Sequence, residues 1–200
     1  MLPKQHQWHT SQINHYQQQN KQALLTSESG LASFTHDFGN LIHSKPSAVC
    51  VAENTQSLQS VIAFANQHQL PLTIRGKGLS QGGQSLAVEG GLILSMEHFT
   101  KTYECQDSTI WVEANASWAD VLHKTTPKNK APFIVPYNAN LSIGGVLSAG
   151  GIGSSSFKYG SINAHVEALE IIDSTGTLHE VDNNSLLFEA CLSGQGLFGV

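Results

Sequence analysis

Residues 48–78 read AVCVAENTQSLQSVIAFANQHQLPLTIRGKG, and apolar runs alternate there with polar breaks. The short apolar run 48–52 is typical of a buried strand. Polar residues at 53–55 are typical of a helix start, and apolar side chains then recur at helical spacing at Leu58, Val61, Ile62 and Ala65. After Pro71, a second strand at 72–74 runs directly into a glycine loop. This order of strand, helix and strand predicts a β-α-β crossover with parallel strands.

The rest of the chain continues this mixture of strands and helices. We expect strands at 92–96, 110–114 and 166–173, the last forming a hairpin with 177–181, and helices at 118–125 (after the N-cap Ser117) and 185–192. Residues 193–200 are typical of a loop that enters a strand, and the sequence stops where that strand should begin, so we expect the chain to be a fragment of a longer protein. The fold class predicted from this pattern is α+β.

The N-terminal 33 residues are rich in Gln, His, Asn and Ser. This composition predicts a polar arm that is either weakly helical or disordered, with packed structure beginning near Phe34. The expected organisation is therefore an arm over 1–33, a first α/β subdomain over 34–100 and a second subdomain over 101–200.

Composition argues against several classes of protein. Only 12% of the residues are charged and the net charge is −5, with no cluster of Lys and Arg, so we expect no nucleic-acid partner. No apolar run reaches the roughly 18 residues of a membrane span. Residues 1–22 lack the apolar core of a secretory signal, and we therefore expect a cytoplasmic protein.

The metal-binding residue types are present but poorly spaced. Three cysteines (Cys50, Cys105 and Cys191) lie far apart, and none of the ten histidines falls in an H-x-x-x-H or H-x-x-E-H pattern. This spacing favours buried apolar cysteines and surface histidines over a disulfide framework or a metal site.

The first candidate site is the glycine loop 75–84, which reads RGKGLSQGGQ. Glycines directly after a strand allow successive backbone N–H groups to face one anion, and such a nest suits a pyrophosphate. The spacing differs from the dinucleotide-binding G-x-G-x-x-G pattern. A tight turn without a ligand would explain Gly76 and Gly78 equally well.

The second candidate site is the stretch 142–156, which is made of Gly, Ser and small apolar residues without a charge. A backbone of this kind can lie close against a flat ligand, and its serine hydroxyls can donate or accept hydrogen bonds. An uncharged pocket also suits an isoalloxazine ring. The alternative is a structural turn whose small residues contact a helix.

Five short motifs together resemble the cytokinin dehydrogenases, a branch of the vanillyl-alcohol-oxidase or PCMH-type FAD-linked oxidases. The motifs are DFGN at 37–40, the loop 75–84, LSIGG at 141–145, FKYG at 157–160 and GLFGV at 196–200. Each motif is loose, but five in the same order over residues 35–200 are specific. The resemblance implies a PCMH-type FAD-binding domain of two α/β subdomains with FAD between them. We expect the substrate (cap) domain of that family to be absent from this chain.

The resemblance also implies cofactor-binding residues. Those in the first loop are Arg75, Gly76, Lys77, Gly78, Leu79, Ser80 and Gln84, which correspond to the pyrophosphate loop and its flank. Those in the second stretch, which would line the flavin and its phosphates, are Ser142, Gly144, Gly145, Ser148 and Ile152, and Val200 falls near the adenine or flavin.

Two positions depart from the family. Members with covalent flavin carry Gly-His-Ser in the first loop, whereas this chain has Gly78-Leu79-Ser80. Leucine has no nucleophile, so we expect FAD to be bound non-covalently. Where cytokinin dehydrogenases place a proton-accepting aspartate, this chain has Tyr137, and a tyrosine with an ordinary pKa of about 10 is a poor base at neutral pH. Tyr137 is thus a weak catalytic candidate that could also line the pocket or pack as an aromatic side chain.

Three functions remain open at this point. The first is an FAD-dependent oxidoreductase that takes a hydride from a C–H bond adjacent to nitrogen or oxygen in a small-molecule substrate. The second is a non-catalytic or decayed FAD- or nucleotide-binding module, which the two departures favour. The third is a related reductase with a nicotinamide donor, which no sequence feature selects.

Overall fold

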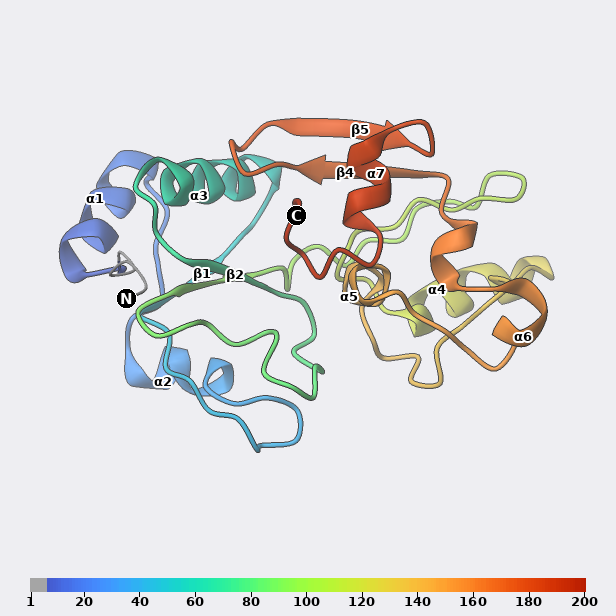
Figure 1. The fold of residues 1–200 in the computed structure, drawn as a ribbon, viewed down its shortest axis with the longest axis horizontal. Coiled ribbons are helices and arrows are strands. Elements are labelled where there is room, and N and C mark those ends of the chain that lie inside the picture. The colour runs from blue at the N-terminus through green and yellow to red at the C-terminus, as the bar shows by residue number, and fades with distance from the viewer. Residues whose placement is uncertain (1–6) are drawn as a thin grey trace. The chain divides into compact units, whose positions relative to one another are not determined.

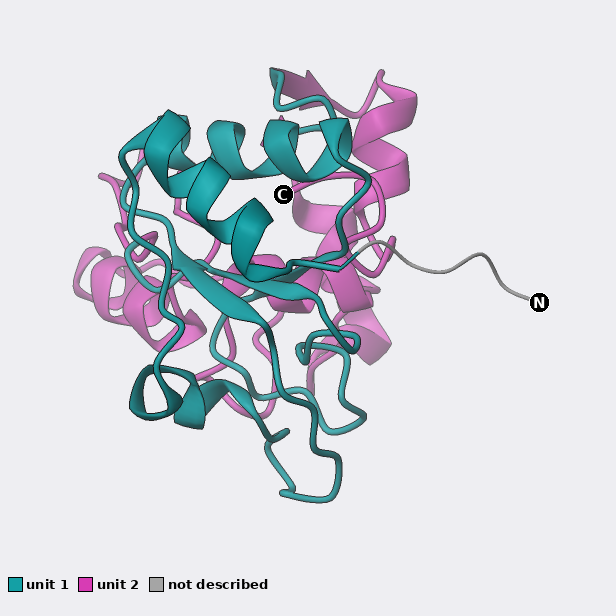
Figure 2. Ribbon diagram, turned by 90° about the vertical axis from the view of Figure 1, so that its left-hand side faces the viewer, with its two compact units in different colours: residues 1–98, 172–178 teal, residues 99–171, 179–200 magenta. Residues whose placement is uncertain are grey.

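The computed structural model describes residues 7–200, which fall into two compact units (Figure 2). Unit 1 comprises the chain up to His98 together with Ile172–Leu178. Unit 2 comprises Phe99–Ile171 and His179–Val200. Each unit has an apolar core of its own.

Unit 1 is built on a three-stranded parallel sheet. Its strands are β1 (Ala48–Val51), β2 (Leu72–Arg75) and β3 (Leu92–Ser95), in the order β1-β3-β2. Every residue of β3 is buried, as expected for a parallel sheet that is covered on both faces. The predicted β-α-β crossover with parallel strands is confirmed. The crossover joins β1 to β2, and β3 lies between these two strands in the sheet.

Helix α3 (Thr55–Gln67) makes this crossover. A capping box begins it: the Asn54 side chain accepts the N–H of Ser57 at 2.9 Å, and the Ser57 hydroxyl oxygen accepts the N–H of Asn54 at 3.1 Å. The predicted apolar stripe is buried together with Phe64. In Figure 1, α3 and α1 (Thr10–Asn20) lie on one side of the sheet, and α2 (Glu28–Leu31) lies on the other.

Packed structure begins well before Phe34, which corrects the expectation of an arm over residues 1–33. Trp8 and Tyr16 are buried, Trp8 stacks on Phe64 with ring centroids 5.6 Å apart, and the Trp8 indole N–H donates to the Pro71 carbonyl oxygen at 2.9 Å. The few large apolar side chains of this polar segment therefore anchor it. Helix α2 and a 3-10 turn, η1 (Ala32–Phe34), follow along the chain. Residues 1–6 lie outside the described part of the chain.

Unit 2 has short helices around an apolar cluster and one hairpin. Its helical elements are α4 (Trp118–Thr125), η2 (Thr126–Lys128), α5 (Ile143–Ala149), α6 (Ser156–Tyr159), η3 (Ile162–His165) and α7 (Leu186–Cys191). The hairpin is formed by β4 (Ala168–Ile172) and β5 (Leu178–Asp182), whose turn, with Ile172 and Leu178, falls in unit 1. The predicted N-cap is confirmed, because Ser117 and Asp120 form a capping box at α4. The core cluster contains Ala116, Trp118, Val121, Ile134, Ile143, Val146 and Ile162.

One predicted strand is wrong. Residues 110–114 form only an isolated antiparallel bridge between Thr102 and Val112, and this segment lies at the surface, where Trp111 is 43% exposed. Residues 193–200 are irregular, and the strand expected to follow them stays a prediction. The β4–β5 hairpin and helix α7 are where the sequence placed them, within two residues at each end.

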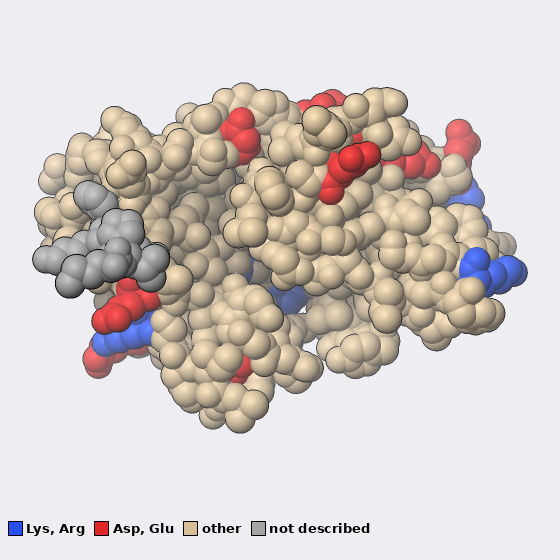
Figure 3. All heavy atoms as spheres, viewed as in Figure 1, with Lys and Arg blue, Asp and Glu red and all other residues tan. Residues whose placement is uncertain are grey.

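The surface carries few charges. On the face drawn in Figure 3, Lys, Arg, Asp and Glu side chains are scattered among uncharged ones, in keeping with the low charged content of the sequence. Over residues 7–200, no helix has the length and apolar character needed to cross a membrane. Within the same range, no group of three or more His, Cys, Asp or Glu side chains is placed to hold a metal ion.

Candidate cofactor site

The glycine loop 75–84 begins at the carboxyl end of β2 in unit 1. This edge of a parallel sheet is where open α/β folds bind their ligands. Arg75 is the last residue of β2, and the backbone turns at Gly78, whose φ is +69°. A residue with a β-carbon rarely adopts this left-handed conformation, so glycine is needed at residue 78 for the turn itself.

The loop presents a row of unused hydrogen-bond donors. Within residues 7–200, the five consecutive N–H groups of Lys77, Gly78, Leu79, Ser80 and Gln81 donate to no other group of the protein. Backbone N–H groups are strong donors, and in this exposed to half-buried loop they are accessible to solvent or to a ligand. A row of them around a left-handed glycine forms a concave anion site of the kind that binds phosphate.

A small cluster of polar side chains closes the base of the loop. The hydroxyl oxygens of Ser80 and Ser85 lie within hydrogen-bond distance, and the N–H of Ser85 donates to the Ser80 hydroxyl oxygen. The N–H of Leu86 donates to the Gly83 carbonyl oxygen at 2.9 Å. The loop is therefore held across its two ends rather than along its length, which leaves the five donors free.

The remaining predicted residues of this loop have different surroundings. The guanidinium of Arg75 is buried, whereas the side chain of Lys77 is exposed beside the free N–H groups. Leu79 is half-buried, as is Gly76. The Gln84 side chain is exposed, and its oxygen accepts the N–H of Gly82 at 3.0 Å, so this side chain caps the loop itself.

The turn 37–42 is joined to the glycine loop within unit 1. The N–H of Phe38 donates to the Ser80 carbonyl oxygen at 3.2 Å. The buried Asp37 carboxylate fixes the turn, because its Oδ1 accepts the N–H groups of Leu41 at 2.9 Å and Ile42 at 3.3 Å. The DFGN motif thus supports the loop that carries the donors.

In unit 2, the stretch expected to be a glycine–serine loop over 142–156 is partly helical. Residues 143–149 form α5, with Ser142 at the N-cap position. Ile143, Val146 and Leu147 recur at helical spacing against the core cluster, and this packing outweighs the low helix propensity of the two glycines. The backbone of this stretch is therefore more regular than its composition predicts.

The two glycines of α5 differ in their surroundings. A β-carbon on Gly144 would lie 3.0 Å from the Ala114 β-carbon and 3.1 Å from the Ala114 carbonyl oxygen, which accepts the Gly144 N–H at 2.7 Å. Gly145 is exposed, and a β-carbon there would meet only the Ser142 hydroxyl, at 2.8 Å. Gly144 is thus required by packing, whereas Gly145 leaves backbone open to a ligand.

The end of α5 is tied to the segment that follows α7. The N–H groups of Ser193 and Gln195 donate to the carbonyl oxygens of Leu147 and Ser148, both at 2.9 Å. The Asn163 amide donates to the Leu147 carbonyl oxygen at 3.2 Å and to the Ser193 hydroxyl at 3.0 Å. Ser148 is therefore held by its backbone while its side chain is half-buried.

Tyr137, Ile152 and Val200 lie in irregular segments of unit 2. The side chains of Tyr137 and Ile152 are 88% and 69% exposed, and Val200 is half-buried. An aromatic group lies in the same segment as Tyr137: Phe133 stacks on His165 with centroids 4.7 Å apart, and the His165 Nε2 is 2.9 Å from the Tyr159 carbonyl oxygen. This exposed apolar surface suits contact with an aromatic or sugar ring.

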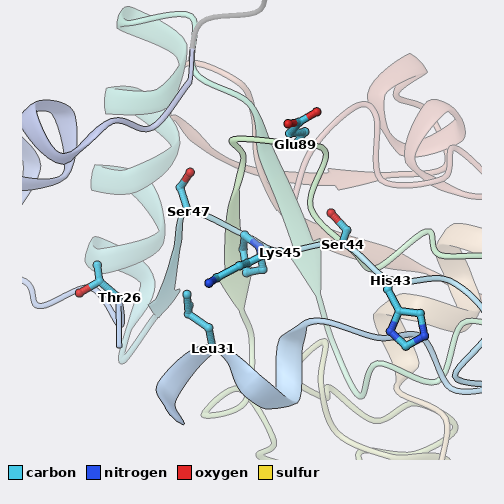
Figure 4. A pocket seen from close by; sticks show the side chains of 8 residues that line it. Thr26, Leu31, His43, Ser44, Lys45, Ser47 and Glu89 are labelled. Carbon is cyan, nitrogen blue, oxygen red and sulfur yellow. The ribbon is translucent and has the colours of Figure 1, made fainter. Parts of the chain in front are cut away.

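A second hollow of unit 1 contains none of these residues. Figure 4 shows its lining, and the residues are Thr26, Leu31, His43, Ser44, Lys45, Pro46, Ser47 and Glu89. Two of its polar side chains are already paired, since Lys45 contacts Glu28 at 3.5 Å and the Ser44 hydroxyl donates to the Ala87 carbonyl oxygen. The free donors of the glycine loop therefore remain the stronger candidate site.

Sequence reasoning missed three groups that hold candidate residues in place, each within its own unit. They are Ser85 with its hydroxyl, Ser33 with its carbonyl oxygen on Arg75, and Asn163 beneath the end of α5. No periodicity or motif marks these residues, because each acts through a contact that only the folded chain creates.

Comparison with known proteins identifies the family of the chain. Residues 46–182 match the family described as the FAD binding domain. The chain is 33% identical over 177 residues to an uncharacterized oxidoreductase from the fasciation locus of Rhodococcoides fascians, covering 88% of this chain and 40% of that protein. It is 31% identical over 182 residues to cytokinin dehydrogenase 2 of Arabidopsis thaliana, covering 88% of this chain and 36% of that protein.

Two solved structures share the fold at low sequence identity. A chitooligosaccharide oxidase superposes with a TM-score of 0.85 at 16% identity, over 94% of this chain and 41% of that one. The 6-hydroxy-D-nicotine oxidase of Arthrobacter nicotinovorans superposes with a TM-score of 0.77 at 17% identity, over 90% of this chain and 40% of that one. The chain thus spans well under half the length of these proteins. With a family match over more than half of its residues, the chain belongs to the FAD-binding domain family of the FAD-linked oxidoreductases.

Proposed function

We propose that this chain is the FAD-binding part of an FAD-dependent oxidoreductase that takes a hydride from a C–H bond adjacent to nitrogen or oxygen. Membership in the FAD-binding domain family and the oxidoreductase names of its relatives support this activity. The activity concerns the whole protein, since the chain spans only part of those relatives.

One observation carries the cofactor assignment, namely the five free N–H groups from Lys77 to Gln81. The pyrophosphate of FAD carries negative charge and several acceptor oxygens, so it matches both the number and the kind of these donors. In this proposal Gly76, Gly78 and Ser80 shape the loop around the pyrophosphate, and the exposed ammonium of Lys77 approaches its oxygens.

Unit 2 offers further candidate cofactor-binding residues of its own. Gly145 offers uncovered backbone, Ser142 and Ser148 offer hydroxyls, and the exposed Ile152 offers an apolar contact for a flat ring. Val200 is assigned to the same site on the resemblance to cytokinin dehydrogenases. Each of these groups binds or orients the cofactor and takes no part in bond making.

We further propose that the flavin is held without a covalent bond. Leu79 stands where covalent members of the family carry histidine, and its alkyl side chain has no atom that can attack the flavin. Bound FAD supplies a two-electron acceptor for the substrate hydride. The protein residues bind it, orient it and exclude water from it.

Tyr137 is the proposed contact to the substrate. Its side chain is almost fully exposed, and its hydroxyl can donate a hydrogen bond to an alcohol or sugar oxygen. Oxidation of an amine or alcohol also releases a proton, and a tyrosine hydroxyl is a poor acceptor for it at neutral pH. With either substrate the released proton therefore passes to water, and only the hydrogen bond from the Tyr137 hydroxyl to a substrate oxygen favours an oxygen-containing substrate over a cytokinin.

The experiment that tests the assignment is a titration of purified protein with FAD. We expect yellow protein with flavin absorbance at about 350 to 500 nm, and we expect acid or heat to release all of the flavin into the supernatant. Colourless protein that takes up no added FAD would disprove the cofactor assignment. Flavin that stays with acid-precipitated protein would disprove non-covalent binding alone.

A second candidate is an FAD-binding module without turnover. The departures at Leu79 and Tyr137 favour it, because both replace residues with chemical roles in the family. Anaerobic mixing of the FAD-loaded protein with a panel of alcohols, sugars and amines separates the two. Bleaching of the flavin by any member of the panel would eliminate the module, and bleaching by a nicotinamide donor alone would indicate a reductase.

A further inference from the structure

Arg75 lies beneath the glycine loop, and its guanidinium contacts the protein on several sides. Nη1 lies 3.4 Å from the Ser85 carbonyl oxygen and 3.3 Å from the Ser85 hydroxyl, and Nη2 donates to the Ser33 carbonyl oxygen at 3.1 Å. The guanidinium also lies over the Phe34 ring, 5.5 Å from its centroid. These contacts use the planar donors of arginine to join two segments far apart in the sequence.

The surroundings of this guanidinium leave it little access to a ligand. Only 9% of Arg75 is exposed, and burial lowers the pKa of the guanidinium from its ordinary value. Lys77, in contrast, is exposed beside the free N–H groups. Of the two cations in the loop, only Lys77 is placed for a direct contact with phosphate.

The guanidinium also limits the residue at position 78. A β-carbon on Gly78 would lie 2.5 Å from Nη2 and 2.7 Å from Cζ of Arg75, which is closer than van der Waals contact allows. The backbone of the loop therefore rests directly on the guanidinium. Any movement of Arg75 moves the support of Gly78, the second residue in the row of free donors.

From these contacts we propose that Arg75 is a positioning residue of the glycine loop. It bridges Ser33 and Ser85 and thereby fixes the N–H groups of residues 77–81 in the arrangement that binds an anion, without touching that anion. This inference rests on the proposed function in one respect, namely that the anion is the pyrophosphate of FAD. The effect on the loop itself is a property of the FAD-free protein.

The FAD-free protein supplies the first test. The amide N–H groups of Phe38, Ser85 and Leu86 are hydrogen-bonded across the loop, so their hydrogen exchange reports its order. In Arg75→Lys, one ammonium cannot replace the bridging guanidinium, and we expect these amides to exchange about tenfold faster. In the matched control Lys77→Gln, we expect exchange at wild-type rates because that side chain is exposed.

Affinity for FAD supplies the second test. We expect Arg75→Lys to raise the Kd for FAD about tenfold at both low and high salt, because the loss is one of geometry. Lys77→Gln should raise the Kd mainly at low salt, because a direct charge contact at the surface is screened. A Kd effect in Arg75→Lys that disappears at high salt, with normal exchange, would overturn the proposal in favour of direct phosphate binding.

Two further variants keep the proposal testable. Should Arg75→Lys fail to fold, Ser85→Ala removes only the hydroxyl that contacts Arg75 Nη1 and the Ser80 hydroxyl. In this variant too, we expect the amides of Phe38 and Leu86 to exchange faster than in the wild type. In a double-mutant cycle, Gly78→Ala should be less harmful in the Arg75→Lys background, which lacks the clashing atoms. Strict additivity would overturn the contact role at residue 78.

Failure of this inference and failure of the proposed function are distinguishable. If wild-type protein binds no FAD, the proposed function fails, while the exchange of the three amides still tests Arg75. If wild-type protein binds FAD and Arg75→Lys exchanges and binds as the wild type does, only the role of Arg75 is disproved.

Discussion

The hydroxyl oxygens of Ser80 and Ser85 lie 2.7 Å apart beneath the glycine loop, and Ser80 also accepts the N–H of Ser85 at 3.3 Å. This pair links Ser80, which belongs to the row of free N–H groups, to Ser85, which is buried and contacts the Arg75 guanidinium. The order of the free N–H groups therefore depends on one small cluster of polar side chains.

Ser80→Ala should loosen this loop without unfolding unit 1. Removing a partly buried hydroxyl with two hydrogen-bond contacts should lower the free energy of unfolding by about 1 kcal/mol and raise the Kd for FAD about three- to tenfold. Urea unfolding and flavin fluorescence titration measure the two effects. Ser174→Ala, at an exposed turn of unit 1, is the matched control and should change neither. Equal Kd values for both variants would show that the loop does not bind FAD.

Alanine at the two glycines of α5 should have opposite effects. In Gly144→Ala the new methyl group presses on Ala114, and we expect a loss of about 1–3 kcal/mol in the free energy of unfolding. In Gly145→Ala the position is exposed and helical, and the higher helix propensity of alanine should stabilise the protein by up to about 1 kcal/mol.

Their effects on cofactor binding complete this comparison. Gly145→Ala should weaken FAD binding although the protein is no less stable, because the methyl group covers backbone that we assign to the cofactor. Urea unfolding and FAD titration of both variants decide the matter. Wild-type FAD affinity in Gly145→Ala would remove this residue from the site.

Much of unit 1 follows from local sequence pattern. The strands at 48–51 and 72–75, helix α3 and their parallel order follow from apolar runs, a capping signal and helical spacing. The N-terminal segment does not, because five large buried side chains in a polar background, among them Trp8 and Tyr16, anchor it by tertiary contacts. Such contacts overrule composition.

In the candidate site, too, local sequence predicts some features and long-range packing sets the others. Glycines after a strand predict a turn with free N–H groups, and the structure has this turn at Gly78. The sequence does not reveal that Arg75 faces inward, that Ser85 closes the loop or that residues 143–149 are helical, because each depends on long-range packing. The residues assigned to FAD remain predictions that the following experiments test.

Leu79→His restores the residue that covalent members of the family carry. In the complete enzyme, we expect a fraction of the flavin to remain attached after acid precipitation, whereas wild-type protein should release all of it. Leu79→Gln is the matched control, since its side chain is polar but cannot form the bond. Absorbance and mass measurements on the precipitated protein detect the adduct. Retention of flavin by the wild type would contradict our interpretation of Leu79.

Tyr137→Phe tests the proposed contact to the substrate. The side chain is 88% exposed, so we expect no change in the free energy of unfolding or in the Kd for FAD. The rate of anaerobic flavin reduction by an alcohol or sugar should fall about tenfold, which is typical of one lost hydrogen bond to the substrate. Tyr103→Phe, at a half-exposed tyrosine in unit 2, is the control. An unchanged reduction rate would return Tyr137 to the role of a surface aromatic.

Cys50 makes the stability of unit 1 sensitive to alkali. It is fully buried in β1, the Gln22 amide donates to its Sγ at 3.2 Å, and burial raises the pKa of the thiol from 9.0 to about 12. Burial, and then the neighbouring Cys50, also raise the pKa of the Tyr16 hydroxyl. In the unfolded chain both groups ionise at their ordinary values, so the unfolded state releases protons first as the pH rises.

The sign of the effect follows from this difference. Below about pH 9 the thiol is protonated in both states and adds no pH dependence, whereas between about pH 9 and 12 the free energy of unfolding falls by about 1.4 kcal/mol per pH unit. Urea unfolding at about pH 7, 9 and 10 measures this slope below the range in which Tyr16 dominates. Cys50→Ala should be less stable at pH 7 yet lose most of the slope between pH 9 and 10, keeping only the smaller part that Tyr16 adds, and Cys105→Ala should keep the full slope. A full slope in Cys50→Ala would assign the alkaline sensitivity to another group, because no thiol would then remain in the interior of the sheet to ionise on unfolding.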